Sequence, residues 1–150
     1  MPVNVLGNQR LLVKLPPALG GIVIFEASDP CHPKPIAEYT ETVQGGVHSS
    51  YVYQNHVYLT DDATGSMRVI DITDPYKPHE VARFQMDQTE EGRYLHDIMV
   101  VDGLAYLSYW NDGLVIVDVG SGIQGGSPEK PVLVSQSKYD LQELYSRVDQ

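Results

Sequence analysis

The chain has 150 residues, 42% of them hydrophobic and 20% charged, a balance typical of one folded domain rather than a disordered segment. Its net charge of −10 argues against nucleic acids and anionic membrane surfaces as partners, because both need a basic patch, but it permits cations. No apolar run is long enough to span a membrane, the N-terminus lacks the pattern of a signal peptide, and the single Cys31 rules out an internal disulfide.

The first part of the chain, residues 1–45, is expected to form an incomplete unit of short strands. Its strongest signal is GGIVIFEASDP, in which β-branched residues follow a glycine turn and end at an Asp-Pro pair. The segment at the N-terminus gives a weaker signal. The strands predicted in this unit are about 3–6, 11–13, 22–25 and 36–39.

The next two units, residues 46–92 and 93–138, each read as four strands in which apolar runs alternate with turn residues. Asn55 and the Asp102-Gly103 pair predict tight hairpin turns after the first strand of each unit. The strands predicted in the two units are about 47–53, 56–60, 66–72, 80–85, 95–101, 104–109, 114–119 and 132–137.

The units repeat one pattern. The acidic residues that end the third strand, Glu26, Asp71 and Asp118, are 45 and 47 residues apart, and a Pro-containing turn follows each of these strands. His48 and His96 recur with the same phase. A period of ~40–50 residues that holds four strands is typical of a β-propeller blade. We therefore predict an all-β fold of about three blades, the alternative being an ordinary β-sandwich whose hairpins are similar by chance.

The end of the chain, residues 139–150, has a different pattern. Asp140 and Glu143 have the spacing of a capping box, and apolar residues follow at helical intervals. The segment predicts either a short helix over about 140–148 or a connector toward another blade.

Two stretches, GGVHSSYVYQNHVYLTDDATGSMRVIDITDP and GRYLHDIMVVDGLAYLSYWNDGLVIVDVGSGIQGGSPEKP, resemble the LVIVD-repeat family of bacterial β-propeller proteins. The resemblance extends over residues 3–140. It implies a propeller and an exported protein, periplasmic or extracellular, but no particular activity. Because a propeller ring needs roughly four to eight blades, we expect the chain to be part of a longer propeller, the alternative being copies that assemble into a ring.

His48 and His96 are the leading candidates for a metal site, because each begins the first strand of a blade, the strand that lines a propeller channel. Imidazole binds divalent transition metals such as Zn, Cu, Fe or Ni, and Asp97, Asp61 and Asp62 could add oxygen ligands. The competing interpretation is structural. A histidine that makes the same hydrogen bond in every blade would recur with the same period.

The loops after the second strand give a candidate binding rim. This rim comprises Asp61, Asp62, Tyr109, Trp110 and Asp112, and its carboxylates and aromatic rings could hold a sugar or a peptide. The alternative is that Asp and Asn cap tight turns and that Trp110 packs between blades.

No catalytic signature accompanies these residues. Residues 120–125 spell GxGxxG but precede GSPEKPVLV, which cannot begin the helix of a dinucleotide site, and Cys31-His32 is interpreted as a chance surface pair. Two hypotheses follow. The first is a non-catalytic binding or scaffold module for a protein, peptide or glycan, and the second is a metal-dependent channel enzyme, an oxidoreductase or hydrolase, with His48 and His96 as ligands.

Overall fold

The computed structural model describes residues 3–6, 9–14, 20–43, 45–87 and 95–138, and all regular elements within these ranges are β-strands. The strands are β1 (Val3–Leu6), β2 (Gln9–Lys14), β3 (Ile22–Glu26), β4 (Lys34–Tyr39), β5 (Val47–Tyr53), β6 (His56–Asp61), β7 (Ser66–Asp71), β8 (His79–Phe84), β9 (Leu95–Val101), β10 (Leu104–Tyr109), β11 (Gly113–Asp118) and β12 (Val132–Ser137).

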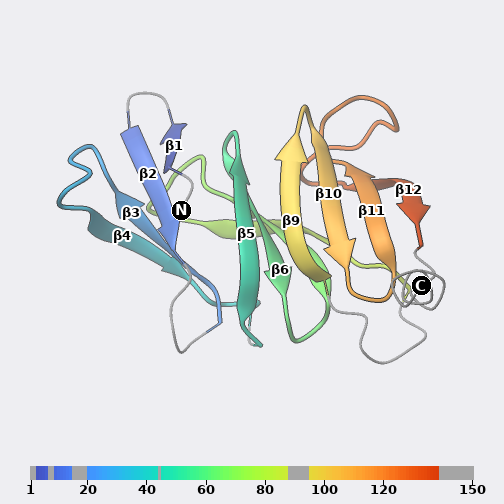
Figure 1. The fold of residues 1–150 in the computed structure, drawn as a ribbon. Helices are drawn as coiled ribbons and strands as arrows, with labels where there is room; N and C mark the ends of the chain where they lie inside the picture. The colour runs from blue at the N-terminus through green and yellow to red at the C-terminus, as the bar shows by residue number, and fades with distance from the viewer. Residues whose placement is uncertain (1–2, 7–8, 15–19, 44, 88–94, 139–150) are drawn as a thin grey trace, which may run out of the picture.

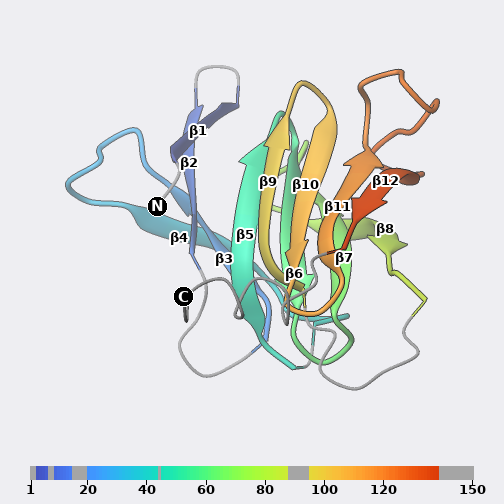
Figure 2. The ribbon, with the colours of Figure 1, turned by 45° about the vertical axis from the view of Figure 1, so that its right-hand side comes forward.

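The twelve strands form three four-stranded antiparallel sheets, and each sheet takes four consecutive strands in chain order. We call them the first sheet (β1–β4), the second sheet (β5–β8) and the third sheet (β9–β12). Figure 1 shows them side by side in that order, with β5 next to β9 near the middle, and Figure 2 shows the same pair from another side. The all-β fold of propeller-like blades is thereby confirmed. The helix predicted over 140–148 lies outside the described residues.

The strands of the second and third sheets begin and end within one residue of their predicted positions. In the first sheet, β2 and β4 are longer than predicted and β3 extends to Glu26. In β2 and β4 the additional residues are polar, charged or proline, such as Gln9, Arg10, Lys34 and Pro35, so the ends of these strands give a weak sequence signal.

The three sheets share one irregularity. The pairing of the third strand with the fourth shifts at Ile24/Phe25, at Val69/Ile70 and at Ile116/Val117. A β-bulge bends and twists the strand that carries it, so the same bulge in each sheet gives all three the same local twist. This register also defines which residues are equivalent, because Ile24, Val69 and Ile116 occupy one position of the repeat.

The core lies between the sheets, and the second sheet is covered on both faces. Side chains on one face, including Val57, Leu59 and Ile70, pack with Ile22 and Ile24 of the first sheet. The opposite face packs against the third sheet, and its most buried members are Tyr58, Met67 and Val69. Since successive side chains of a strand point to opposite faces and both faces are covered, β6 and β7 are buried along nearly their whole length.

The acidic residue that ends each third strand anchors the turn that follows. Oxygens of Glu26, Asp71 and Asp118 accept hydrogen bonds from the backbone N–H two residues later, at 2.8, 2.6 and 2.9 Å. Asp118 is buried and also accepts the N–H groups of Ser121, Gln124 and Gly126, which fixes the glycine-rich loop of 120–126. Residues 120–125 therefore form a loop that folds around a carboxylate.

Gly113 is required by the close approach of two strands. It has a φ of +77°, and a Cβ atom built on it would lie 2.1 Å from the carbonyl oxygen of Ser137. Gly21 occupies the equivalent position in the first sheet, with a φ of +109° and a Cβ 2.0 Å from the carbonyl oxygen of Tyr39. Only glycine fits both the backbone angle and the space.

We predict that Gly113→Ala destabilises the fold more than Gly122→Ala. Both glycines have a positive φ, at +77° and +82°, but a Cβ at Gly122 would meet nothing within 4 Å. The control therefore carries the backbone strain alone, about 1–2 kcal/mol, whereas the Gly113 variant adds about 1–3 kcal/mol for the clash. Urea unfolding measures both variants, and equal free energies of unfolding would contradict the role given to Gly113.

Asp118 is predicted to make the fold sensitive to acid. Backbone hydrogen bonds, first that from Gly120, hold the pKa of Asp118 well below its usual range. A carboxyl whose pKa is depressed on folding stabilises the protein above the pKa it has when unfolded, ~4, and this contribution is lost as the pH falls through the folded pKa.

We therefore expect Asp118→Ala to lower the melting temperature at pH 7 more than Asp71→Ala does, since the carboxylate of Asp71 anchors a single backbone N–H in its turn. The difference between the two variants should shrink in acid. Thermal melts at several pH values measure it, and a difference independent of pH would refute the assignment.

Candidate functional site

Two histidines stand at irregularities in the first strands of the second and third sheets. The pairing of β5 with β6 shifts between Val47 and Ser50, and that of β9 with β10 shifts between Leu95 and Asp97, so His48 and His96 lie within the two bulges. In β5 the hydroxyl of Thr60 accepts the backbone N–H groups of His48 and Ser49, at 3.2 and 2.9 Å. A bulge re-aims the side chain that it carries, and here it does so at the same point of two sheets.

Equivalent residues of the two sheets meet across the gap between β5 and β9. The imidazole rings of His48 and His96, which are 48 residues apart in the sequence, lie with their centroids 4.4 Å apart. The hydroxyl of Ser49 donates a 2.6 Å hydrogen bond to Asp97, which is also 48 residues further along. Residues one repeat apart touch in this way when the first strands of successive blades run side by side.

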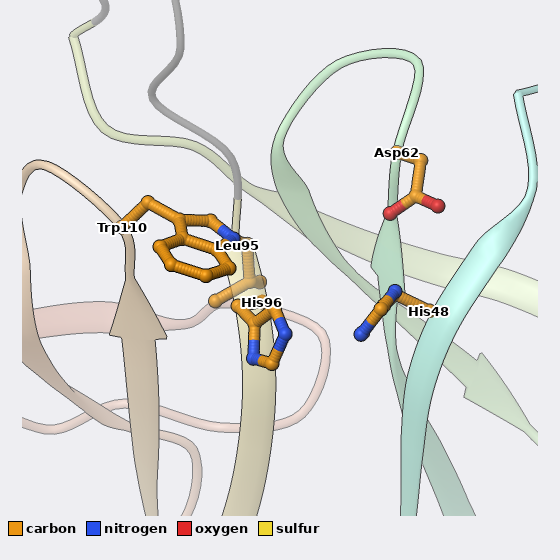
Figure 3. Close-up of a pocket in the computed structure, with 5 residues that line it drawn as sticks. All are labelled: His48, Asp62, Leu95, His96 and Trp110. Carbon is orange, nitrogen blue, oxygen red and sulfur yellow. The ribbon is translucent and has the colours of Figure 1, made fainter.

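A pocket of about 310 Å³ opens at this point, lined by His48, Asp62, Leu95, His96 and Trp110. Figure 3 shows the two imidazoles facing one another, with the carboxylate of Asp62 on the His48 side and the indole of Trp110 on the His96 side. Trp110 meets His96 edge to face, at 4.9 Å between ring centroids. Asp62 and Trp110 are themselves equivalent residues, 48 apart, in the loops β6–β7 and β10–β11. The pocket is therefore built from two pairs of repeat positions and a buried leucine.

The polar and apolar parts of the pocket differ in exposure. Leu95 is buried, Asp62 and His96 are half-buried, and Trp110 is 61% exposed. Burial raises the pKa of Asp62, and the nearby His48 and His96 act in the opposite direction. The site therefore offers one exposed aromatic face, one carboxylate and two imidazoles within a small volume.

The predicted metal ligands are brought together only in part. His48 and His96 converge, but Asp97 bonds to Ser49 and to the backbone of Ile98 and does not line the pocket. Asp62, named as an additional oxygen ligand, does line it. Among the residues that the structure describes, no group of three or more His, Cys, Asp or Glu side chains is arranged to hold a metal ion.

The predicted rim divides into exposed and buried members. Asp62 and Trp110 face the pocket. Asp61, Tyr109 and Asp112 are each less than 5% exposed, so they are buried where the second strand of each sheet ends or just beyond it. Burial raises the pKa of the Tyr109 phenol far above its usual range, which keeps it neutral.

Asp61 is held by an arginine that the sequence analysis did not single out. Arg68, 7% exposed, bonds Asp61 through Nε at 2.8 Å and through a terminal nitrogen at 2.7 Å. Its other terminal nitrogen lies 2.9 Å from Glu80, which also accepts the hydroxyl of Thr42. Thr42 and the hydroxyl of Tyr39 are 2.9 Å apart. This polar network spans the interface between the first and second sheets, and its one sequence signal was a charged residue inside the apolar run SMRVID.

The fold and its repeated contacts define the class of protein. Three four-stranded antiparallel sheets, stacked face to face and joined in chain order, are consecutive blades of a β-propeller-type repeat module. The LVIVD repeat family matches residues 44–86 and 92–136, together more than half of the chain. The chain belongs to this family, and the two matched repeats contain the second and third sheets. A comparison with curated proteins finds no match.

We predict that Arg68→Met destabilises the protein by about 3–5 kcal/mol, because it leaves the buried carboxylate of Asp61 and the half-buried carboxylate of Glu80 without their cation. Arg83→Ala is the matched control, since Arg83 pairs directly opposite Arg68 in the β7–β8 ladder but is exposed. The control should change the free energy of unfolding by less than about 1 kcal/mol. If chemical denaturation gave the two variants equal losses in the free energy of unfolding, the network around Arg68 would not stabilise the fold.

Proposed function

We propose that this LVIVD repeat module is a non-catalytic binding platform and that its ligand site is the pocket between β5 and β9. The observation that carries the proposal is the convergence of two pairs of repeat positions on one cavity of about 310 Å³. Such a volume is at the lower end of the range for ligand pockets, which run from roughly 300 to 1,000 Å³. It suits a single small ring better than a length of peptide.

The chemistry of the lining favours a sugar unit. The exposed indole of Trp110 offers an apolar face on which the C–H face of a pyranose can stack, and Leu95 adds apolar surface. Asp62 accepts hydrogen bonds, and each neutral imidazole both donates and accepts, so the groups match hydroxyls around the ring. In this proposal the glycan binds beside Asp62 and Trp110 of the rim and the two histidines.

Further blades complete the platform in this proposal, because the module is part of a larger assembly. The exported location that the family implies, periplasmic or extracellular, agrees with a glycan ligand. No helix in the described part of the chain is long and apolar enough to cross a membrane.

The second candidate is the metal-dependent channel enzyme. One observation favours it, the 4.4 Å separation of the His48 and His96 rings with Asp62 in the same pocket. Two imidazoles and a carboxylate are a donor set suited to Zn²⁺ or Ni²⁺. The side chains are not arranged as a three-ligand group in the described ranges, which is why this candidate ranks second.

Fluorescence of Trp110 tests the first candidate directly, because it is the one tryptophan in the sequence and it lines the pocket. We expect a panel of neutral mono- and disaccharides to include members that shift its emission saturably. In Asp62→Asn the Kd for such a sugar should rise at least ~10-fold, since the variant removes a hydrogen bond to a charged group worth about 1.5–3 kcal/mol. In His96→Ala the Kd should rise ~2–10-fold, since a hydrogen bond between neutral groups is worth about 0.5–1.5 kcal/mol.

His32→Ala is the control, because His32 is exposed and bonds to Asp29 in a turn of the first sheet, away from the pocket. It should bind as the unaltered chain does. A panel without any saturable response would contradict the glycan site. Zn²⁺ titrations in the same assay separate the candidates: stoichiometric Zn²⁺ binding that is lost in both His48→Ala and His96→Ala would favour the metal site instead.

A further inference from the structure

The far face of the third sheet, turned away from the second sheet, carries the same apolar pattern as a face that is fully packed elsewhere in the chain. We call it the outer face and define it by Met99, Val101, Tyr106, Leu114 and Ile116. Met99, Tyr106 and Ile116 are cross-strand partners in the ladders β9–β10 and β10–β11, so they point to the same side. Val101 and Leu114 lie two residues from Met99 and Ile116 and share that side.

The shared register gives each outer-face residue a counterpart in the second sheet. The bulges align Ile116 with Val69 and Leu114 with Met67, and the hairpins align Tyr106 with Tyr58. By the same alignment, Met99 and Val101 correspond to the half-buried Tyr51 and Tyr53. Those counterparts form the face of the second sheet that packs on the third, where Val69 and Met67 are 0% exposed.

On the outer face the same positions are uncovered. Met99 is 47% exposed and Val101 is 41% exposed, and Tyr106, Leu114 and Ile116 are all more exposed than their buried counterparts. Neighbouring apolar side chains left in water on one side of a sheet mark an interaction surface. What covers the equivalent positions of the second sheet is another sheet of the same repeat, through the face that carries Val117 and its neighbours.

The first sheet has the complementary face. Ile22 and Ile24 pack on the second sheet, so Val23 and Phe25 point to the opposite side, and both are half-buried. The bulge at Ile24/Phe25 aligns Phe25 with Ile70 and Val117, which are the residues through which the second and third sheets pack on the sheet before them. The outer face of the third sheet is thus equivalent to the faces on which a following sheet packs. The Val23/Phe25 face of the first sheet is equivalent to the faces that pack on a preceding sheet.

We propose that the outer face binds the Val23/Phe25 face of a second copy of this chain. The contact repeats, between copies, the interface that the chain already makes twice within itself. Two copies related by a two-fold axis would use both open faces and close a ring of six sheets, within the range of roughly four to eight blades in which propellers close. Because each contact joins the outer face of one copy to the Val23/Phe25 face of the other, the closed ring leaves neither face exposed.

Light scattering after size-exclusion chromatography of the chain tests this proposal. We expect twice the 16.7 kDa chain mass. Met99→Glu should return the mass to that of a monomer with unchanged circular dichroism, because Met99 is exposed within the chain and its replacement disturbs no internal packing. Leu133→Glu is the control: Leu133 is 43% exposed on the same sheet, but it pairs opposite Val117 and so lies on the other side. It should remain a dimer.

A mixing experiment tests the pairing of unlike faces. Phe25→Glu and Met99→Glu should each be monomeric alone, and an equimolar mixture should recover dimer, because one partner keeps its outer face and the other keeps its Val23/Phe25 face. A folded monomer of the unaltered chain would overturn the proposal and leave the outer face to a different partner. A dimer that Met99→Glu does not dissociate, or an open-ended series of masses, would overturn it as well.

Discussion

The burial of both faces of the second sheet is the constraint on which the rest of this structure depends. A four-stranded sheet with apolar residues on both sides cannot cover itself, so each face needs another sheet. In β6 and β7 adjacent residues pack in opposite directions, with Ile70 against the first sheet and Val69 against the third. The repeat supplies the neighbours, and this is why strands such as GLVIVDV recur along the chain. The hydrophobic effect thereby fixes the order of the sheets as well as the fold of each one.

The candidate site is a consequence of the same stacking. Once two sheets pack in one register, every position of the repeat comes near its counterpart one repeat later. Ser49 and Asp97 are close enough to form a hydrogen bond between the second and third sheets. His48 and His96, which lie in the bulges of β5 and β9, contact each other and line the pocket. The loops after the second strands have diverged, with Asp62 in one and Trp110 in the other. A shared framework with unlike side chains at equivalent positions is how a repeat protein acquires a binding site.

The sequence was sufficient for the strands, their grouping in fours and the convergence of the two histidines, because all three follow from periodicity. It was insufficient for the direction of individual side chains near irregularities. Asp97 adjoins His96, so the sequence groups the two, but Asp97 bonds Ser49 and does not line the pocket. The sequence predicts Asp61 as a rim carboxylate, because nothing local indicates that Arg68, seven residues later, lies beside it in the interior. Bulges and buried ion pairs depend on tertiary contacts, and the alternation of apolar and polar residues along a strand does not indicate them.

One measurement tests the stacking most directly, namely methyl–methyl nuclear Overhauser contacts of the neighbouring residues Val69 and Ile70. The structure predicts that the Ile70 methyls contact Ile22 or Ile24 of the first sheet and that the Val69 methyls contact methyls of the third sheet, such as Leu107 or Val117. Contacts from both residues to the same sheet, or from neither to any other sheet, would contradict the face-to-face order of the three sheets and with it the pocket between the second and third.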